Sequence, residues 1–508
     1  MTGLHAVRQR RRRRRDRPGR MSLVLAAAVV VIGLAVPAVV VDSRIGELLL
    51  LAPVCLALGI CALASPVFAT VLLLVTMFLR LPLSDQGVPN DSYLGVVVLA
   101  LIGTVALMDR SNDTLRRFGA VEWCMALYLL WNVYSMAAYH RYPAGPQVPD
   151  QNGLIGEFSV PRFIVVGTVV PFLLYCVGRH AFDRESAVRV ALWTILAVAG
   201  YSALTSILQF TGPAELVWPS YIIDIPSYPD RAVGVFNHPV ANGMVLSFGL
   251  AIGMILASHR AEPPWRRYLA LLGAIGCGWG VYLTHTRAAW LTGMVVLIIG
   301  VVFAKRARMG FGIAIGLVAA TILANWSVFV SSDRAAGGVA SAQEVDDRLN
   351  TIQTALWAVV QKPIAGWGIG RFPAVNTFHH QQWSPDIPWD RGYGIVSHGT
   401  ELGVLAEVGI VGLLLWVGVL ALIVFRLRDA YRRLSDDELS GRPIVLIAFM
   451  ALAVLVGTGL TVDLRFFDYP VVVVFLLAGI AVGCADRHRK AEQVSAPDAD
   501  QRLLCHHG

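Results

Sequence analysis

The sequence predicts an all-α protein: a polytopic bundle of about fourteen transmembrane helices, with one long loop outside the membrane that carries short helices. Three observations predict this fold class. Of the 508 residues, 56% are hydrophobic and only 15% are charged, whereas soluble domains have about 25% charged residues. The mean hydropathy is +0.62. Apolar segments of membrane-spanning length also recur along the whole chain, so we expect one continuous bundle and not several soluble domains.

The expected spans are apolar runs bounded by charged residues, because about twenty helical residues cross the hydrocarbon core of a bilayer. An arginine-rich stretch, Arg8–Arg20, precedes the first run. That run is longer than the apolar region of a signal peptide, so we interpret it as an uncleaved anchor. The spans lie near residues 21–41, 47–64, 67–83, 93–108, 118–138, 163–178, 187–210, 240–258, 268–284, 288–304, 309–330, 401–425, 443–461 and 469–485.

Lysine and arginine predict which loops face the cytoplasm, because short inner loops carry an excess of both. Every second short loop of this chain is basic, as in Lys305–Arg308 and Arg426–Arg442. This alternation predicts that both termini are cytoplasmic. It leaves three long segments on the outer side, near residues 139–162, 211–239 and 331–400. A long loop in a compact bundle usually carries function, so we expect the chemistry there.

The chain accordingly divides into five parts. They are a basic cytoplasmic N-terminus (1–20), transmembrane helices 1–11 (21–330), the large extracytoplasmic loop (331–400), transmembrane helices 12–14 (401–485) and a polar cytoplasmic tail (486–508), which we expect to be disordered. The net charge of +8 arises mostly in the inner loops. It therefore predicts contact with membrane lipids and not with nucleic acid. The seven cysteines show no metal-ligand spacing, so we expect neither a zinc site nor a disulfide framework.

Ionisable side chains are nearly absent from the middle of the predicted spans and gather at their outer ends. An ion-coupled transporter needs titratable or ion-binding groups at membrane depth, so this distribution argues against a proton-driven pump. It favours a site at the outer interface that acts on an amphiphile. The residues concerned are Arg231, His238, His285, Arg287, Arg348, Arg371, His379, His380, Arg391, His398, Glu401 and Glu407.

Two arginines and one histidine of this set are the main candidates. Arg231 precedes one span, and Arg287 stands at the outer corner between two others. A guanidinium group binds phosphate oxygens through two hydrogen bonds and stays protonated, which suits a diphosphate head group. Interfacial arginines also extend to water without any ligand. His398 stands just before a span, where a neutral imidazole can accept a proton from a hydroxyl group. Glu401, one turn later, is placed to orient that ring.

The long loop contains further candidates. Apolar residues at spacings of three and four predict an amphipathic helix over residues 346–362, lying along the membrane surface or packed on the bundle. The glycines within residues 366–370 predict either a simple turn or a backbone contact to phosphate. Trp383 and Trp389 are either stacking platforms for sugar rings or anchors at the membrane surface.

Motifs follow one another in a fixed order along roughly residues 200–425. They are Arg231 with Asn237, the corner Thr284-His285-Thr286-Arg287, the loop pattern Arg348…Trp357-Ala358…Pro363-Ile364-Ala365-Gly366-Trp367-Gly368, and His398 followed by Glu407-Val408-Gly409-Ile410-Val411-Gly412. This ordered set resembles the O-antigen ligase and O-antigen polymerase superfamily. The chain departs from that family's pattern at Gly399, where asparagine is usual, and at His238-Pro239 in the asparagine-rich turn.

The resemblance implies a GT-C-like glycosyltransferase of a bacterial cytoplasmic membrane, with the active site facing outside and no metal ion or other cofactor. Such an enzyme, a ligase or a repeat-unit polymerase, moves a glycan from undecaprenyl diphosphate to a hydroxyl group of a glycan or lipid acceptor. Carried over, Arg231 and Arg287 bind the diphosphate, and His398 is the general base. Further substrate contacts are expected from Arg348, Arg371, Asn237, Glu401, Glu407, Trp383 and Trp389.

Two other classes of protein remain open at this point. A transporter or flippase of lipid-linked saccharides would use the same basic outer groove without chemistry. A cell-wall polymerase of the shape-and-division class would catalyse through an acidic residue of an outer loop, for which Asp386, Asp390 and Glu401 are the candidates. The combination of His398 with the motif at Glu407 favours the ligase interpretation.

Overall fold

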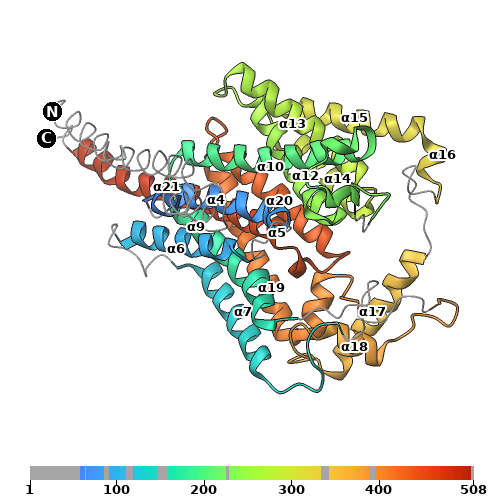
Figure 1. Cartoon of the computed structure of the whole chain (residues 1–508). Coiled ribbons are helices and arrows are strands. Elements are labelled where there is room, and N and C mark those ends of the chain that lie inside the picture. The colour runs from blue at the N-terminus through green and yellow to red at the C-terminus, as the bar shows by residue number, and fades with distance from the viewer. Residues whose placement is uncertain are drawn as a thin grey trace, which may run out of the picture.

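The computed structural model describes residues 58–62, 64–84, 91–109, 118–146, 158–224, 228–332, 343–388 and 395–504. In this part of the chain the regular structure is helical and no strand is present. Long helices lie side by side, and shorter ones gather at one end of the bundle (Figure 1). The arrangement confirms the predicted all-α membrane bundle.

The long helices begin and end close to the predicted spans. Of those spans, 21–41 and most of 47–64 lie outside the described residues. The long helices are α4 (Pro66–Phe78), continued by the short α5 (Arg80–Ser84), α6 (Tyr93–Asp109), α7 (Ala120–Ala137), α9 (Val170–Ala181), α10 (Glu185–Thr211), α12 (Pro239–Ser258), α13 (Pro264–Leu283), α14 (Arg287–Phe303), α15 (Arg308–Ala324), α19 (Thr400–Arg433), α20 (Arg442–Gly459) and α21 (Asp468–Leu504). Helix α8 (Val160–Ile164) and a π-helical turn, η3 (Val165–Val169), lead directly into α9.

Within the described residues, six helices are long and apolar enough to cross a membrane: Val160–Ala181, α10, α12, α19, α20 and the first part of α21. The shorter elements are α11 (Tyr221–Asp224), α16 (Trp326–Phe329), α17 (Gln343–Gln361), α18 (Phe372–His379) and the 3₁₀ turns η4 (Ala214–Leu216), η5 (Gly234–Phe236) and η6 (Leu464–Phe466). The amphipathic helix predicted over residues 346–362 is α17. We call the end of the bundle that carries α16, α17 and α18 the loop end.

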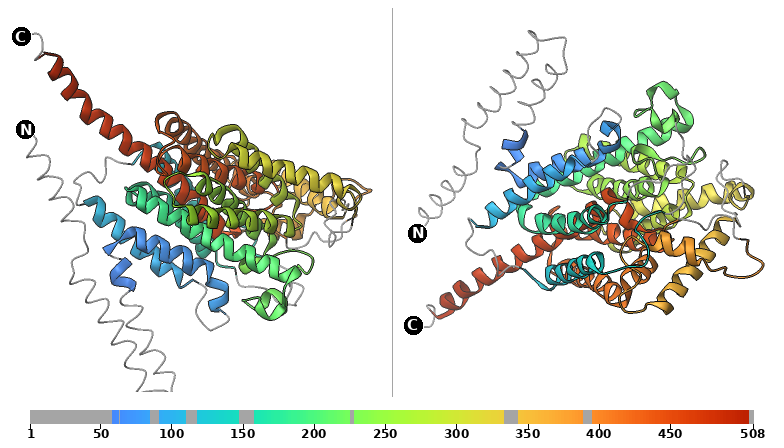
Figure 2. Two further views of the ribbon diagram at one scale, coloured as in Figure 1. Left: turned by 90° about the horizontal axis from the view of Figure 1, so that it is seen from above. Right: turned by 60° about the horizontal axis from the view of Figure 1, so that its bottom comes forward.

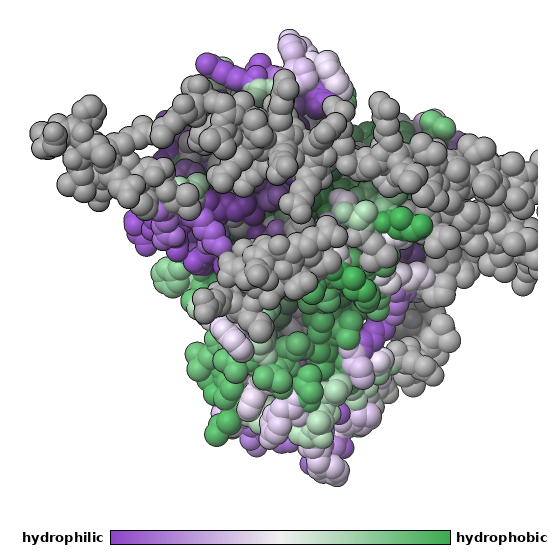
Figure 3. All heavy atoms as spheres, turned by 90° about the vertical axis from the view of Figure 1, so that its left-hand side faces the viewer, coloured by the Kyte–Doolittle hydropathy of each residue, from purple (hydrophilic) through white to green (hydrophobic). Residues whose placement is uncertain are grey.

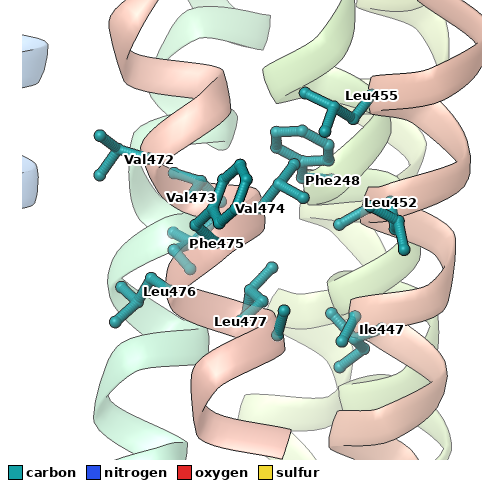
Figure 4. Close-up of a cluster of buried hydrophobic side chains, with 14 of the residues drawn as sticks. Phe248, Ile447, Leu452, Leu455, Val472, Val473, Val474, Phe475, Leu476 and Leu477 are labelled. Atoms are coloured by element: carbon teal, nitrogen blue, oxygen red, sulfur yellow. The ribbon is translucent and has the colours of Figure 1, made fainter. Parts of the chain in front are cut away.

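The centre of the bundle is formed by α12, α20 and α21. Every residue of α12 from Pro239 to Leu256 is buried. Figure 4 shows Phe248 of α12 among side chains of α20, such as Leu455, and of α21, such as Phe475. In a membrane, dispersion contacts between such side chains are a main force that holds helices together.

Helices α9 and α21 approach each other closely because glycines lie between them. A Cβ atom on Gly479 would lie 2.1 Å from the carbonyl oxygen of Tyr175, and one on Gly483 would lie 2.2 Å from that of Arg179. Small residues at such contacts let two helix backbones touch within a bilayer. A larger side chain at Gly479 or Gly483 would force α21 away from α9.

The outward faces of the bundle are apolar. Leu272 and Ile275 of α13, and Ile313 and Leu317 of α15, all expose large hydrophobic side chains. Viewed from the end that carries the chain termini, Figure 3 shows a broad hydrophobic area beside a hydrophilic one. Soluble monomers rarely expose apolar surface on this scale, so we expect these faces to contact lipid.

Arginines concentrate at the end of the bundle opposite the loop end, which we call the basic end. There Arg179 pairs with Asp486 at 2.8 Å, and Arg189 pairs with Glu262 at 2.5 Å. These ion pairs join segments that are far apart in the sequence. The connections at this end are the loops that the basic residues predicted to be cytoplasmic.

The C-terminal segment differs from the prediction. Helix α21 continues to Leu504 and projects beyond the bundle (Figure 2), whereas the composition of residues 486–508 predicted disorder. Contacts at the basic end hold the first turns of this extension. Arg487 donates to the carbonyl oxygen of Arg179 at 3.3 Å, and Arg489 pairs with Asp429 at 2.8 Å. Composition does not report such contacts, because their partners lie in other helices.

Candidate active site

Arg287 is the first residue of α14 and follows the tight corner that joins α13 to α14. His285, within that corner, is buried and has a left-handed backbone with φ of 43°. Its Nδ1 lies 2.6 Å from the carbonyl oxygen of Asp230. A carbonyl oxygen can only accept, so Nδ1 carries the proton and donates. The corner before Arg287 is therefore attached to the segment that carries Arg231.

Arg231 lies in the segment that leads to α12, and three contacts fix this segment. The N–H group of Ala232 donates to the carbonyl oxygen of Leu283, at the end of α13, over 2.9 Å. Gln209 Nε2 donates to the carbonyl oxygen of Arg231 at 3.0 Å. The guanidinium group lies 5.7 Å from the centre of the Tyr228 ring. Arg231 and Arg287 thus stand on neighbouring segments that hydrogen bonds hold together at the loop end.

A buried polar network holds the Arg231 segment against the bundle. Asn242 of α12 donates from Nδ2 to the carbonyl oxygen of Ala232 at 3.0 Å and to Ser206 Oγ at 2.9 Å. Its Oδ1 accepts from Ser202 Oγ at 2.7 Å. Asn237, the asparagine expected to contact substrate, has a left-handed backbone, and its buried Oδ1 makes no hydrogen bond to the described residues. Asn242 is therefore the structural asparagine of this turn.

His238 links the Arg231 segment to the connection between α20 and α21. Its Nδ1 accepts from the N–H group of Val240 at 3.2 Å, which caps α12. Its ring centre lies 5.3 Å from that of Tyr228 and 4.6 Å from that of Phe467. Burial lowers the pKa of His238 to about 4, so the ring is neutral at physiological pH. This histidine acts as a packed cap and not as a cation.

His398 lies half-buried in the segment that ends the long loop. Its Nδ1 lies 3.3 Å from the carbonyl oxygen of Val396, an acceptor, so Nδ1 carries the proton and the lone pair is on Nε2. A Cβ atom on the next residue, Gly399, would lie 3.7 Å from the carbonyl oxygens of both Gly459 and Leu460. The His398 segment therefore rests on the end of α20.

The start of α19 is fixed on the same connection. Thr400 Oγ1 accepts from the N–H group of Leu464 at 3.0 Å and donates to the carbonyl oxygen of Val462 at 3.1 Å. Helix α20 also packs against α14, because a Cβ atom on Gly457 would lie 2.8 Å from Cγ2 of Thr292. The connection from α20 to α21 thus contacts both the His398 segment and the His238 segment. Arg231, Arg287 and His398 all lie at the loop end.

A buried ion cluster stands next to this connection. Arg465 pairs with Glu407 Oε2 at 2.7 Å and with Asp463 Oδ2 at 2.5 Å, and the three side chains are only 6%, 3% and 1% exposed. Burial alone would lower the pKa of Arg465, but the two carboxylates raise it well above its ordinary value. The remaining oxygen of Glu407 accepts from the N–H group of Phe372 at 2.9 Å. Glu407 therefore binds α19 to the start of α18 and to η6.

Part of the chain that forms this end of the bundle matches a known family model. A family model described as O-antigen ligase matches residues 271–417, from α13 through α17 and α18 into α19. Over these residues the chain is similar to O-antigen ligases. No curated protein matches the chain. Of the candidates, Arg231 and Asn237 precede the matched stretch, which contains Arg287, Arg348, Arg371, Trp383, Trp389, His398, Glu401 and Glu407.

In the O-antigen ligase stretch, the glycine-rich turn packs the loop onto α19. Gly366 and Gly368 have φ of 69° and 103°, which favours glycine. A Cβ atom on Gly366 would lie 2.4 Å from the carbonyl group of Glu407. The N–H groups of Trp367 and Gly368 donate to the carbonyl oxygens of Ala406 and Glu407 at 2.9 and 2.7 Å. The N–H groups of Trp367 and Gly368 therefore already have acceptors within the protein. The segment acts as a turn, and these two N–H groups are not available to a phosphate.

Arg371 follows the glycine-rich turn and holds the outer segment after α7. Its Nε donates to the carbonyl oxygen of Tyr142 at 2.9 Å, and its Nη1 donates to that of Ile369 at 3.1 Å. Burial lowers the pKa of Arg371, and Glu407 opposes that shift. The structure thus gives this arginine a role in fixing the loop, which the sequence pattern alone did not indicate.

The remaining candidates lie at different places in the matched stretch. Glu401 is in the first turn of α19, and its buried Oε2 makes no hydrogen bond in the described part of the protein. Arg348 lies on α17. Trp383 is half-exposed after α18, and its backbone N–H group donates to Asn350 Oδ1 at 2.8 Å. Trp389 lies outside the described residues.

Sequence reasoning missed Arg465 and Asp463 as partners of Glu407. Neither residue was among the candidates, because single charged residues are common in a short loop between two spans. The available signal was their position: two opposite charges, two residues apart, between the apolar spans 443–461 and 469–485. Charged groups so close to hydrocarbon are expected to pair, and Glu407 is a nearby charge at the start of another span.

Proposed function

We propose that this protein transfers a glycan from a polyprenyl-diphosphate donor to an acceptor hydroxyl group on the outer face of the bacterial cytoplasmic membrane. The match of residues 271–417 to the O-antigen ligase family model supports an enzyme of the ligase or polymerase type that uses lipid-linked glycans. One observation carries the finer proposal. The segments of Arg231 and Arg287 are hydrogen-bonded to each other at the end of the bundle that also carries His398.

In the proposed reaction the two arginines hold the donor's diphosphate. Their guanidinium groups neutralise its charge and stabilise the additional charge that develops as it leaves. Arg287 is the first residue of α14, so the positive end of that helix dipole adds to the same field. We infer that this field replaces a metal ion, and the proposed mechanism needs none.

His398 acts as the general base. The oxygen of the acceptor hydroxyl attacks the anomeric carbon of the donor glycan while Nε2 of His398 takes the hydroxyl proton. The bond between the anomeric carbon and the diphosphate oxygen breaks, and polyprenyl diphosphate leaves with the bonding electrons. The new glycosidic bond replaces the one that is lost, so the step needs no oxidant or reductant.

The orientation follows from the charge of the two ends. The basic end carries Arg179, Arg189, Arg487 and Arg489 in ion pairs or hydrogen bonds, and the positive-inside rule assigns such an end to the cytoplasm. The loop end, with His398, would then face outward. Donors that have been flipped across the membrane would meet the site there.

The test is donor turnover by the purified protein. With a polyprenyl-diphosphate glycan and an acceptor in detergent, where no ion gradient exists, we expect release of polyprenyl diphosphate and a glycosylated acceptor. Chromatography of the lipid product measures the rate. Addition of EDTA should leave the rate unchanged. Absence of turnover, together with gradient-dependent movement of the donor in vesicles, would instead support the transporter alternative.

Exchange of Arg287 for lysine should lower transfer by about 10- to 100-fold, because a two-bond contact to phosphate becomes a point charge. Donor affinity, measured by titration of labelled donor, should fall as well. Arg308→Lys is the matched control, because Arg308 is the first residue of the next helix and lies at the basic end, bonded to the carbonyl oxygens of Val301 and Val302. Unchanged donor affinity in Arg287→Lys would contradict the diphosphate contact.

A further inference from the structure

A pocket of about 370 Å³ lies at the loop end, where α7 ends and the long loop crosses α19. One wall is formed by residues from Tyr134 to His140, and the other by Lys362 to Gly366. None of the residues assigned to glycan transfer lines it. The pocket therefore has no role in the proposed reaction.

The pocket carries one positive charge. The Lys362 ammonium group lies 4.4 Å from the centre of the Trp367 ring, which holds it in place. His140 Nε2 lies 2.6 Å from the carbonyl oxygen of Ser135 and so donates to it. Burial lowers the pKa of His140, and the positive charges of Arg371 and Lys362 lower it further, so this ring is neutral. No carboxylate is among the lining residues. An anion would find one ammonium group and no opposing charge.

Two apolar stripes lead to the pocket. Helices α7 and α19 pack together, and Trp131 Nε1 donates to the carbonyl oxygen of Val408 at 2.8 Å. Each helix also exposes large apolar side chains at spacings of three and four. Both stripes end at the pocket, because Tyr134 lines it and the N–H group of Ile410 donates to the carbonyl oxygen of Pro363 at 2.8 Å. The exposed residues are Leu127, Leu130 and Tyr134 on α7, and Ile410, Leu414 and Val417 on α19.

We propose that this pocket binds the phosphate head group of an anionic phospholipid, whose two acyl chains lie along α7 and α19. A single ammonium group matches the single negative charge of a phosphodiester, whereas a diphosphate would need more cations. Two apolar stripes likewise match two acyl chains and not one polyprenyl chain. Tyr139 at the rim is 96% exposed, as expected of an aromatic side chain at a membrane–water interface. The bound lipid would join the end of α7 to the long loop.

Native mass spectrometry of the purified full-length chain tests this assignment. The detergent-solubilised protein is incubated with phosphatidylglycerol or with phosphatidylcholine of the same acyl chains, and the retained lipid is counted. We expect preferential retention of phosphatidylglycerol. Lys362→Gln should lower that retention about fivefold, and Lys362→Arg should preserve it. Lys490→Gln, which removes an exposed lysine at the other end of the protein, is the matched control and should change nothing.

Three outcomes would overturn the proposal. They are equal retention of the two phospholipids, unchanged phosphatidylglycerol retention in Lys362→Gln, and displacement of bound phosphatidylglycerol by an equimolar amount of undecaprenyl phosphate. The last would assign the pocket to a single-chain lipid. Thermal unfolding of Lys362→Gln in detergent should match the wild type, which separates loss of lipid from loss of fold. The experiment measures only lipid binding, so its result tests the lipid site independently of the proposed glycan transfer.

Discussion

Replacing His398 with alanine is expected to lower the rate of glycan transfer by about 10²–10⁴-fold, the usual contribution of one positioned general base. The reason lies in the tautomer of the ring. Nδ1 donates to the carbonyl oxygen of Val396 over 3.3 Å, which places the ring's lone pair on Nε2, the atom that takes the acceptor's proton in the proposed reaction. Alanine removes that nitrogen and leaves the backbone of the segment, which packs through Gly399 and Thr400, in place. The measurement is the initial rate at saturating donor and acceptor.

Donor affinity separates catalysis from binding in this variant. If His398 acts only on the acceptor hydroxyl, labelled donor should bind His398→Ala as tightly as it binds the wild type. His488→Ala, an exposed histidine on the projecting part of α21, is the control and should keep full activity. A wild-type rate in His398→Ala would remove the base from the mechanism. Loss of donor binding would reassign His398 to the diphosphate contact.

The sequence predicted the membrane helices well because lipid imposes a simple requirement. A span must be apolar over about twenty residues and must satisfy its own backbone hydrogen bonds. The predicted span 187–210 is therefore recovered as Glu185–Thr211, and 240–258 as Pro239–Ser258. The extension of α21 to Leu504 was missed because it depends on partners such as Asp429, which belong to another helix.

The site was predictable to the level of a region but not to the level of individual contacts. Helix ends and loop order bring Arg231, Arg287 and His398 to one end of the bundle, and any alternating topology would do so. Which side chains face each other depends on the rotation of each helix, which local patterns do not encode. Glu407 was expected near substrate, yet it is enclosed by Arg465 and Asp463.

The same limit applies to the two asparagines and to the glycines. Asn237 and Asn242 both lie near the start of one span, and only the packing of α12 against α10 shows that Asn242 holds the turn. The glycine-rich turn was read as a turn or as an anion contact. The deciding fact is that α19 bends at Gly409, where φ is 70°, and offers its carbonyl groups to the loop.

Removal of the Arg465 guanidinium group by an Arg465→Met substitution is expected to cost about 3–5 kcal/mol of unfolding free energy, because it leaves two carboxylates buried without their cation. Glu407 and Asp463 are only 3% and 1% exposed, so water cannot replace the lost charge. The measurement is unfolding of the purified protein by SDS, followed by circular dichroism. Arg306→Met breaks the exposed pair with Asp437 at the basic end and should cost no more than about 1 kcal/mol.

The carboxylates themselves distinguish an electrostatic cause from simple loss of packing. If uncompensated charge causes the instability of Arg465→Met, neutralising one carboxylate should restore part of the lost unfolding free energy. The double variant Arg465→Met/Glu407→Gln should then be more stable than Arg465→Met alone, even though Glu407→Gln by itself breaks an ion pair. Additive losses would mean that Arg465 acts mainly through its packing on Phe163.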